Sequence, residues 1–104
     1  MSEIGDIFQD LPRRYVPGQV RKPMSFYFSL DEDEKWTVRF TPDGCEITEG
    51  HADADCFFKG SKQLFLDVWN GRYTPSAMDF LTGKIKSNNP MALKDFLLGF
   101  GKKV

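Results

Sequence analysis

Residues 70–91 read NGRYTPSAMDFLTGKIKSNNPM, and glycine, proline and asparagine divide this run into very short pieces. Thr74 and Pro75 predict the beginning of a helix, because a threonine caps the first turn and a proline at the first helical position loses no hydrogen bond. We expect this helix to end at Gly83. Residues 84–87 alternate lysine with an apolar residue and predict a short strand with a basic outer face. Pieces this short are predicted to fold back over a larger core.

Longer helices are predicted on both sides of this run. Ser61 precedes a helical pattern that stops at Gly71, and Asn89 with Pro90 begins another that closes at Gly101. Apolar stripes at this spacing are usually core, although methionine also suits an adaptable apolar pocket. The residues that the three helices are expected to turn inward are Leu64, Phe65, Val68, Trp69, Ala77, Met78, Leu81, Met91, Leu93, Phe96, Leu97 and Phe100.

Before residue 60 the apolar residues alternate with polar ones, which is the period of a half-buried strand. The alternation predicts four strands, over residues 24–30, 36–40, 45–50 and 53–59. A charged turn over residues 31–35 and a tight turn at TPDG, residues 41–44, separate the first three. We expect the four strands to form an antiparallel meander, which the strand at 84–87 joins after a helical crossover. The predicted fold class is α+β, with helices covering one face of a five-stranded, mostly antiparallel sheet.

The N-terminal residues 2–11 permit a short amphipathic helix, with Ser2 as its cap and an end at Pro12. Its apolar residues at helical spacing are Ile4, Ile7, Phe8 and Leu11. The 104 residues suffice for one hydrophobic core and not for two. We therefore expect a single domain over residues 1–104, with a helix and lead-in over 1–24 and the core over 25–100.

The composition is that of a globular protein, with 40% hydrophobic residues, 28% charged residues and a formal net charge of −1. The sequence contains neither an apolar run of about 18 residues nor a basic start followed by an apolar stretch, so neither a transmembrane helix nor a secretion signal is predicted. We expect a cytoplasmic protein. Cys45 and Cys56 are too few and too far apart for a disulfide framework or a zinc motif, and are interpreted as buried thiols.

Charge is distributed unevenly along the chain. The sequence from Asp31 to Asp55 contains nine acidic and two basic residues, whereas the sequence from Cys56 to Val104 contains eight basic and three acidic residues. A basic half allows a transient contact with an anionic membrane surface, through Lys84, Lys86, Lys102 and Lys103. An ordinary solvated surface is the other interpretation. The acidic strands would repel phosphates, so no nucleic-acid partner is predicted.

Signals for catalysis are sparse. His51 is the only histidine and lies in a polar stretch with Glu49, Asp53 and Asp55, which could orient it or bind a metal with it. The nucleophile elbow, the P-loop and the dinucleotide fingerprint are all absent from the sequence. We expect a non-enzymatic protein with no catalytic residue, no metal and no cofactor, and we keep an enzyme that uses His51 with Asp53 or Asp55 as an alternative.

Two motifs resemble those of a known family. ADADCFF, residues 52–58, and the long stretch at residues 64–93, LFLDVWNGRYTPSAMDFLTGKIKSNNPMAL, are similar to the strand entry and the helix–strand–helix segment of the sterol carrier protein family, the SCP2-like sterol-transfer family. The likeness covers about residues 25–100 in element order. The helix before the first strand is shorter than is usual in the family. The ending GKKV is not a peroxisomal address, which fits a bacterial-like member.

The resemblance implies a sterol-carrier-like domain whose helices enclose an apolar tunnel. Such domains perform no chemistry on their ligands, which are fatty acids, fatty acyl-CoA, sterols or phospholipids, but bind or transfer them. By motif, the predicted ligand-binding residues are Leu64, Phe65, Val68, Trp69, Met78, Leu81, Ile85, Met91, Phe96 and Leu97. A second hypothesis is an accessory or dimerisation module that docks on a lipid-metabolising enzyme. We expect a monomer or a weak dimer.

Overall fold

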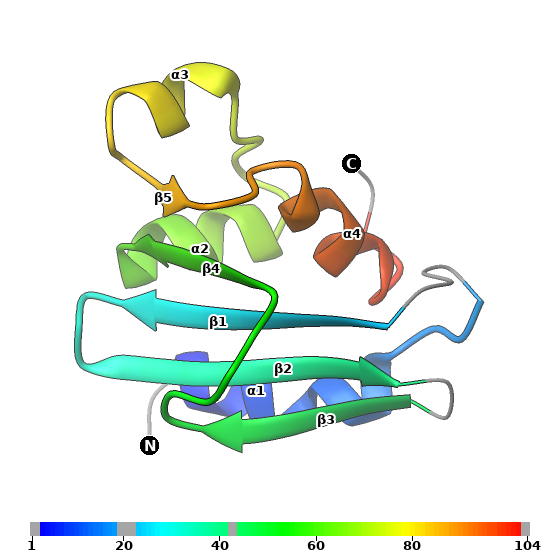
Figure 1. The fold of residues 1–104 in the computed structure, drawn as a ribbon. Coiled ribbons are helices and arrows are strands. Elements are labelled where there is room, and N and C mark those ends of the chain that lie inside the picture. The colour runs from blue at the N-terminus through cyan, green and yellow to red at the C-terminus, as the bar shows by residue number, and fades with distance from the viewer. Residues whose placement is uncertain (1–2, 19–22, 42–43, 103–104) are drawn as a thin grey trace.

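The computed structural model describes residues 3–18, 23–41 and 44–102. Four helices and five strands follow one another along these described residues (Figure 1). Their order and bounds are α1 (Glu3–Arg14), β1 (Met24–Leu30), β2 (Glu34–Thr41), β3 (Gly44–Glu49), β4 (Cys56–Gly60), α2 (Lys62–Trp69), α3 (Ala77–Leu81), β5 (Lys86–Ser87) and α4 (Ala92–Leu98). The structure confirms the α+β class and a five-stranded, mostly antiparallel sheet.

The order of strands across the sheet is β3-β2-β1-β4-β5. The meander prediction is wrong for β4, which pairs in parallel with β1 and places Cys56 beside Phe26. The connection from β3 crosses the outer face of the sheet, where Thr37 donates its hydroxyl to the Gly50 carbonyl at 2.9 Å. At its far end the Asp55 amide donates to the hydroxyl of Ser25 at 2.8 Å. Because these side chains satisfy the polar backbone of the connection, the chain can cross two strands before it pairs again.

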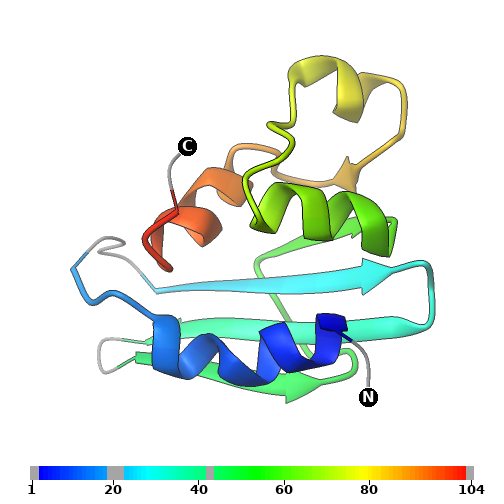
Figure 2. The same cartoon turned by 180° about the vertical axis from the view of Figure 1, so that it is seen from behind.

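The helices lie on one face of the sheet, as the alternation predicted (Figure 2). That face carries the buried strand residues Phe26, Phe28, Leu30, Trp36, Val38, Phe40, Cys56 and Phe58. α1 covers β2 and β3, whereas α2 and α4 cover the half of the sheet that contains β4 (Figure 2). α3 lies farther out, beyond α2 and α4 (Figure 1). The molecule therefore has a sheet, a layer of three helices, and α3 outside that layer.

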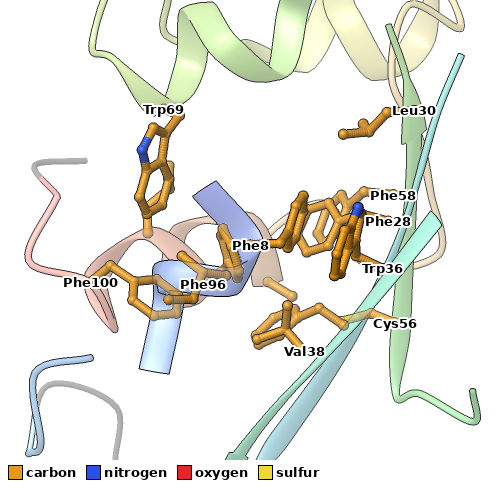
Figure 3. Packing of buried hydrophobic residues seen from close by; sticks show 14 of the residues in the cluster. Phe8, Phe28, Leu30, Trp36, Val38, Cys56, Phe58, Trp69, Phe96 and Phe100 are labelled. Atoms are coloured by element: carbon orange, nitrogen blue, oxygen red, sulfur yellow. The ribbon is translucent and has the colours of Figure 1, made fainter. Parts of the chain in front are cut away.

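Aromatic rings fill the space between the sheet and the helix layer (Figure 3). Phe8 of α1 stacks on Trp36 at 5.3 Å between ring centroids and on Phe65 of α2 at 5.2 Å. The ring centroid of Phe96 in α4 lies 4.7 Å from that of Phe28. Aromatic pairs at these separations add to the stability that burial of apolar area already provides. The inner layer is thus a packed core.

Pro12 does not end α1, contrary to the prediction, and the helix continues to Arg14. A proline in the last turn forfeits only one backbone hydrogen bond, and Pro12 itself is exposed. Asp10 accepts a hydrogen bond from Nε of Arg14 at 2.6 Å, which supports the turn that contains the proline. Ser2, the predicted cap, lies outside the described residues.

Other element ends differ from the predictions by a few residues. α3 begins at Ala77 rather than Pro75, and α4 spans Ala92–Leu98 rather than starting at Pro90. The strand expected over residues 84–87 is reduced to Lys86–Ser87. Pro42 and Asp43, half of the predicted TPDG turn, lie outside the described residues. Within the part of the chain that the structure describes, no helix has the length and apolar character needed to cross a membrane.

Candidate functional site

A cavity of about 740 Å³ lies between the outer α3 and the layer formed by α2 and α4. It is partly open to solvent, and most of its exposed wall is apolar. The larger apolar side chains of the wall are Val68, Trp69, Phe80, Met91, Leu93 and Leu97. The segment that joins α2 to α3 contributes Asn70, Tyr73, Thr74, Pro75 and Ser76, and two lysines, Lys94 and Lys102, complete the charged part of the wall.

α2 is held in place at its first turn. Ser61, predicted near the start of this helix, accepts a hydrogen bond on its hydroxyl from the Leu64 amide at 3.0 Å. Asp31, in the turn after β1, accepts from the Lys62 amide at 3.1 Å. Lys62 also pairs with Asp33 at 2.9 Å. These contacts attach the helix to the sheet and so determine where Val68 and Trp69 enter the cavity wall.

The outer wall depends on a buried carboxylate, Asp79, in the first turn of α3. Asp79 accepts hydrogen bonds from the Tyr73 hydroxyl at 2.6 Å and from the Ser76 amide at 2.8 Å. The hydrogen bond from Tyr73 and the one from the Ser76 backbone lower the pKa of Asp79, and the same contact with Asp79 raises the pKa of Tyr73. One carboxylate therefore both begins α3 and fixes the loop before it.

Sequence reasoning missed this capping group. Ser76 and Asp79 have the Ser-x-x-Asp spacing of a helix N-terminus, which was present in the sequence and identifies Ser76 as the cap. Thr74, the predicted cap, instead lines the cavity with Pro75.

The corrected register changes which α3 residues face inward. Met78 is 61% exposed and Leu81 is 79% exposed, so the prediction that both turn inward is wrong. Asp79 and Phe80 face the body of the molecule instead. The cause is the cap, since Asp79 must point back toward Ser76 and Tyr73, and a five-residue helix has only one such face.

The structure distributes the other predicted ligand-binding residues over three places. Four of them line the cavity: Val68, Trp69, Met91 and Leu97. Leu64, Phe65 and Ile85, together with Val68, line a much smaller apolar pocket of about 40 Å³ between α2 and the sheet. Phe96 is fully buried among the core rings. The wall residues that were not predicted as ligand-binding include Tyr73, Phe80, Leu93, Lys94 and Lys102.

Lys102 places its ammonium over an apolar part of the wall. Its Nζ lies 4.3 Å from the ring centroid of Trp69, a cation–π geometry. Partial burial and, secondly, the nearby charge of Arg14 lower the pKa of Lys102. Lys84, outside the cavity wall, makes a similar contact with the ring of Tyr73 at 4.7 Å. Positive charge therefore lies beside Trp69, at the end of α2, and beside Tyr73, in the segment that joins α2 to α3.

The polar groups considered for chemistry lie elsewhere. His51 is exposed on the outer sheet face, where its ring meets that of Tyr27 at 4.6 Å. Asp55, its proposed partner, accepts hydrogen bonds from the amide and hydroxyl of Ser25. Among residues 3–18, 23–41 and 44–102 no three His, Cys, Asp or Glu side chains gather closely enough to hold a metal ion.

The two cysteines differ in burial. Cys56 is buried and Cys45 is half-buried. Desolvation raises the pKa of Cys45 to about 12 and that of Cys56 to about 11, so both thiols are protonated near neutral pH.

The model of the SCP-2 sterol transfer family matches residues 22–93. This chain therefore belongs to that family, as the two sequence motifs indicated. Membership of this family supports the assignment of the chain to the general class of lipid-binding or lipid-transfer domains. No protein with a curated description matches the chain.

Solved structures share the fold at low sequence identity. The sec-alkylsulfatase Pisa1 from Pseudomonas sp. superimposes with a TM-score of 0.75 and 14% identity, over 94% of this chain and 16% of that chain. Sterol carrier protein 2 from Yarrowia lipolytica, in its apo form, superimposes with a TM-score of 0.56 and 18% identity, over 95% of this chain and 91% of that chain. The ubiquinone synthesis protein UbiJ-SCP2 superimposes with a TM-score of 0.56 and 9% identity, over 89% of this chain and 74% of that chain. This chain thus spans about one sixth of the sulfatase and most of the sterol carrier protein.

Proposed function

We propose that this protein binds one hydrophobic lipid, without chemical conversion, in the cavity between α2, α3 and α4. The observation that carries the proposal is the cavity itself, because about 740 Å³ of mostly apolar space falls within the usual size of ligand sites. Membership of the SCP-2 sterol transfer family supports the same class of ligand. The candidates are fatty acids, fatty acyl-CoA, sterols and phospholipids, held for transfer or for presentation to a partner.

The hydrophobic effect alone is large enough to give a lipid a useful affinity for this cavity. Each methylene removed from water contributes about 0.8 kcal/mol, so a chain of roughly 14 methylenes contributes about 11 kcal/mol before association costs of several kcal/mol. Micromolar binding therefore requires no catalytic group and few polar contacts. A cavity of this kind discriminates weakly between lipids of similar length.

We assign ligand contact to the residues that face the cavity. From the sequence prediction these are Val68, Trp69, Met91 and Leu97, to which Phe80 and Leu93 are added. Leu64, Phe65 and Ile85 would touch only a ligand that reaches the smaller inner pocket. Phe96 belongs to the core, and Met78 and Leu81 lie outside the cavity wall.

The test measures lipid bound to freshly prepared protein by native mass spectrometry, and then the binding of a fluorescent fatty acid to delipidated protein. Ala77 lines the cavity from α3 and is exposed, so Ala77→Trp fills the cavity without entering the core. Met78→Trp adds the same ring to the next residue, which is not part of the wall. We expect Ala77→Trp to abolish saturable binding and Met78→Trp to leave it unchanged.

Two results would contradict the proposal. One is the absence of both added mass and saturable binding in the unaltered protein. The other is equal loss of binding in the two tryptophan variants, which would place the lipid outside this cavity.

A second function is favoured by the exposed apolar residues of the outer layer. Met78, Leu81 and Met91 are 61%, 79% and 65% exposed. Such a surface suits an accessory or dimerisation module that docks on another protein. A dimer that persists on dilution in light scattering, combined with no lipid uptake, would favour this function over lipid binding.

Charge supports a role for anionic membranes in delivery of the lipid. Lys84 and Lys86 are exposed in the described part of the chain, whereas Lys103 lies outside it. Vesicle binding that strengthens with anionic lipid and weakens with salt would support this role, and salt-independent binding would remove it.

A further inference from the structure

The charged residues in the described wall of the cavity are all positive. Lys94 projects from α4, and Lys102 follows that helix. Neither lysine makes an ion pair with any residue that the structure describes. The wall therefore combines a long apolar surface with two ammonium groups that lack a counter-charge there.

Three acidic residues adjoin residues of this wall along the chain, and they are Asp67, Asp79 and Asp95. Burial raises the pKa of Cys56, and the charges of Asp55 and Asp95 raise it further, so Asp95 lies close to that thiol. Asp79 accepts hydrogen bonds from Tyr73 and Ser76, and the lysine whose charge acts on it is Lys84, which lies outside the cavity wall. Asp67 accepts hydrogen bonds from Gln63 at 3.0 Å and from Arg72 at 3.1 Å. None of these three carboxylates makes an ion pair with Lys94 or Lys102.

Lys102 is the more constrained of the two lysines. Its ammonium is held over the Trp69 ring, and Arg14, which approaches from α1, is also positive and already pairs with Asp10. Partial removal of a cation from water without a counter-ion costs free energy. A negative group at this position would relieve that cost and gain a charge-assisted hydrogen bond.

We propose that the ligand of this cavity is an anionic amphiphile, whose carboxylate or phosphate lies between Lys94 and Lys102 while its apolar chain covers Val68, Phe80 and Leu97. This inference rests on the proposed function and makes it narrower. A neutral lipid alcohol, such as a sterol, fills the same apolar wall but leaves both ammonium groups unpaired. A quaternary ammonium head would be repelled by them.

The experiment compares amphiphiles that share one chain and differ in the head group. Dodecanoate, dodecyl phosphate, dodecanol and dodecyltrimethylammonium are titrated below their micelle concentrations into delipidated protein by calorimetry. We expect dodecanoate or dodecyl phosphate to bind roughly tenfold or more tightly than dodecanol, the factor that one charge-assisted hydrogen bond supports. The ratio of the two anions separates a carboxylate ligand from a phosphate ligand. We expect the cationic amphiphile to bind most weakly.

The variant that tests the two lysines is Lys94→Met with Lys102→Met, since methionine retains most of the apolar stem that packs on the wall. We expect it to reduce the affinity for the preferred anion to that for dodecanol, while dodecanol itself binds as before. Lys35→Met is the matched control, because Lys35 is an exposed lysine of β2 outside the cavity wall. A thermal melt of each variant verifies that it is folded.

The outcomes separate this inference from the function on which it rests. Equal affinity for dodecanol and both anions, or a preference that survives the double variant, overturns the anionic ligand but leaves lipid binding intact. Failure of all four amphiphiles to bind overturns the proposed function as well.

Discussion

At the scale of single residues, the largest fully buried side chains are phenylalanines, which pack the core and carry no reactive group. Phe8 is fully buried and stacks on both Trp36 and Phe65, so it joins α1, the sheet and α2 in one contact. Met78, by contrast, is a large apolar residue that contacts mainly solvent. Hydrophobicity alone does not distinguish these two residues, whereas their packing does.

Phe8→Ala is expected to lower the free energy of unfolding by about 3 to 5 kcal/mol, because the ring leaves a cavity between three packed elements. Met78→Ala should change it by less than about 0.5 kcal/mol, as for other exposed sites. Urea unfolding followed by tryptophan fluorescence measures both. Similar losses for the two variants would contradict the placement of α3 in this structure.

Val68 is expected to limit the length of a bound chain. Val68 and Leu93 line both the cavity and the inner pocket, so these side chains form the wall between the two spaces. Val68→Ala should open that wall to longer acyl chains, and each methylene that enters would gain about 0.8 kcal/mol, roughly a fourfold change in affinity. Binding of a series of fatty acids measures the shift. An unchanged chain-length preference would show that the ligand does not reach the wall.

At the scale of elements, the main lesson comes from α3. Period and punctuation predicted a short helix before Gly83, and it exists, but the face that it turns inward follows from the Asp79 hydrogen bonds. A helix of five residues has too few side chains for its apolar stripe to decide its orientation, so one carboxylate determines it. For α2, with eight residues and a Ser61 cap, pattern and structure agree.

Protonation of Asp79 should loosen α3. Its hydrogen bonds from Tyr73 and Ser76 depress its pKa below the ordinary value of 3.8, so near that value the unfolded chain binds more protons than the folded one. The resulting stabilisation is fully present above the unfolded value and is lost as the pH falls through the lower folded pKa.

Thermal melts of the unaltered protein and of Asp79→Asn measure this effect. We expect the unaltered protein to be the more stable at neutral pH, and the difference to shrink as the pH falls below 3.8. The difference is informative because the other carboxylates titrate in both proteins. A constant difference across the acidic range would show that the Asp79 charge does not hold α3.

At the scale of the whole molecule, the helix layer is seated on the sheet through one very close approach. Gly99 follows α4, and a Cβ atom at this position would lie 2.6 Å from Cζ of Phe40 in β2. The Phe40 ring cannot easily move, because Phe26, Phe96 and Phe100 surround it. The backbone of the last helix therefore packs directly on a ring of the sheet.

Gly99→Ala is expected to destabilise the protein by about 1 to 3 kcal/mol through overpacking. Gly60→Ala is the matched control, since its Cβ atom would meet only ordinary contacts, at 3.5 Å from the Lys84 carbonyl oxygen. Denaturant unfolding of both variants gives the comparison. Tolerance of alanine at position 99 would indicate that α4 sits farther from β2.

The sequence by itself determined the fold class, the existence and type of the elements, and the sheet face that carries the core, because periods of two and of 3.6 residues report directly which side of an element is apolar. It also predicted four residues of the cavity wall, Val68, Trp69, Met91 and Leu97.

Only the tertiary structure decided the parallel pairing of β4 with β1, the outward turn of Met78 and Leu81, and the place of Lys94 and Lys102 in one wall. These features depend on which segments meet in space. Local periodicity contains no information about contacts between distant segments. The connection that crosses the sheet from β3 determines the pairing of β4, and the buried carboxylate of Asp79 determines which face α3 turns inward.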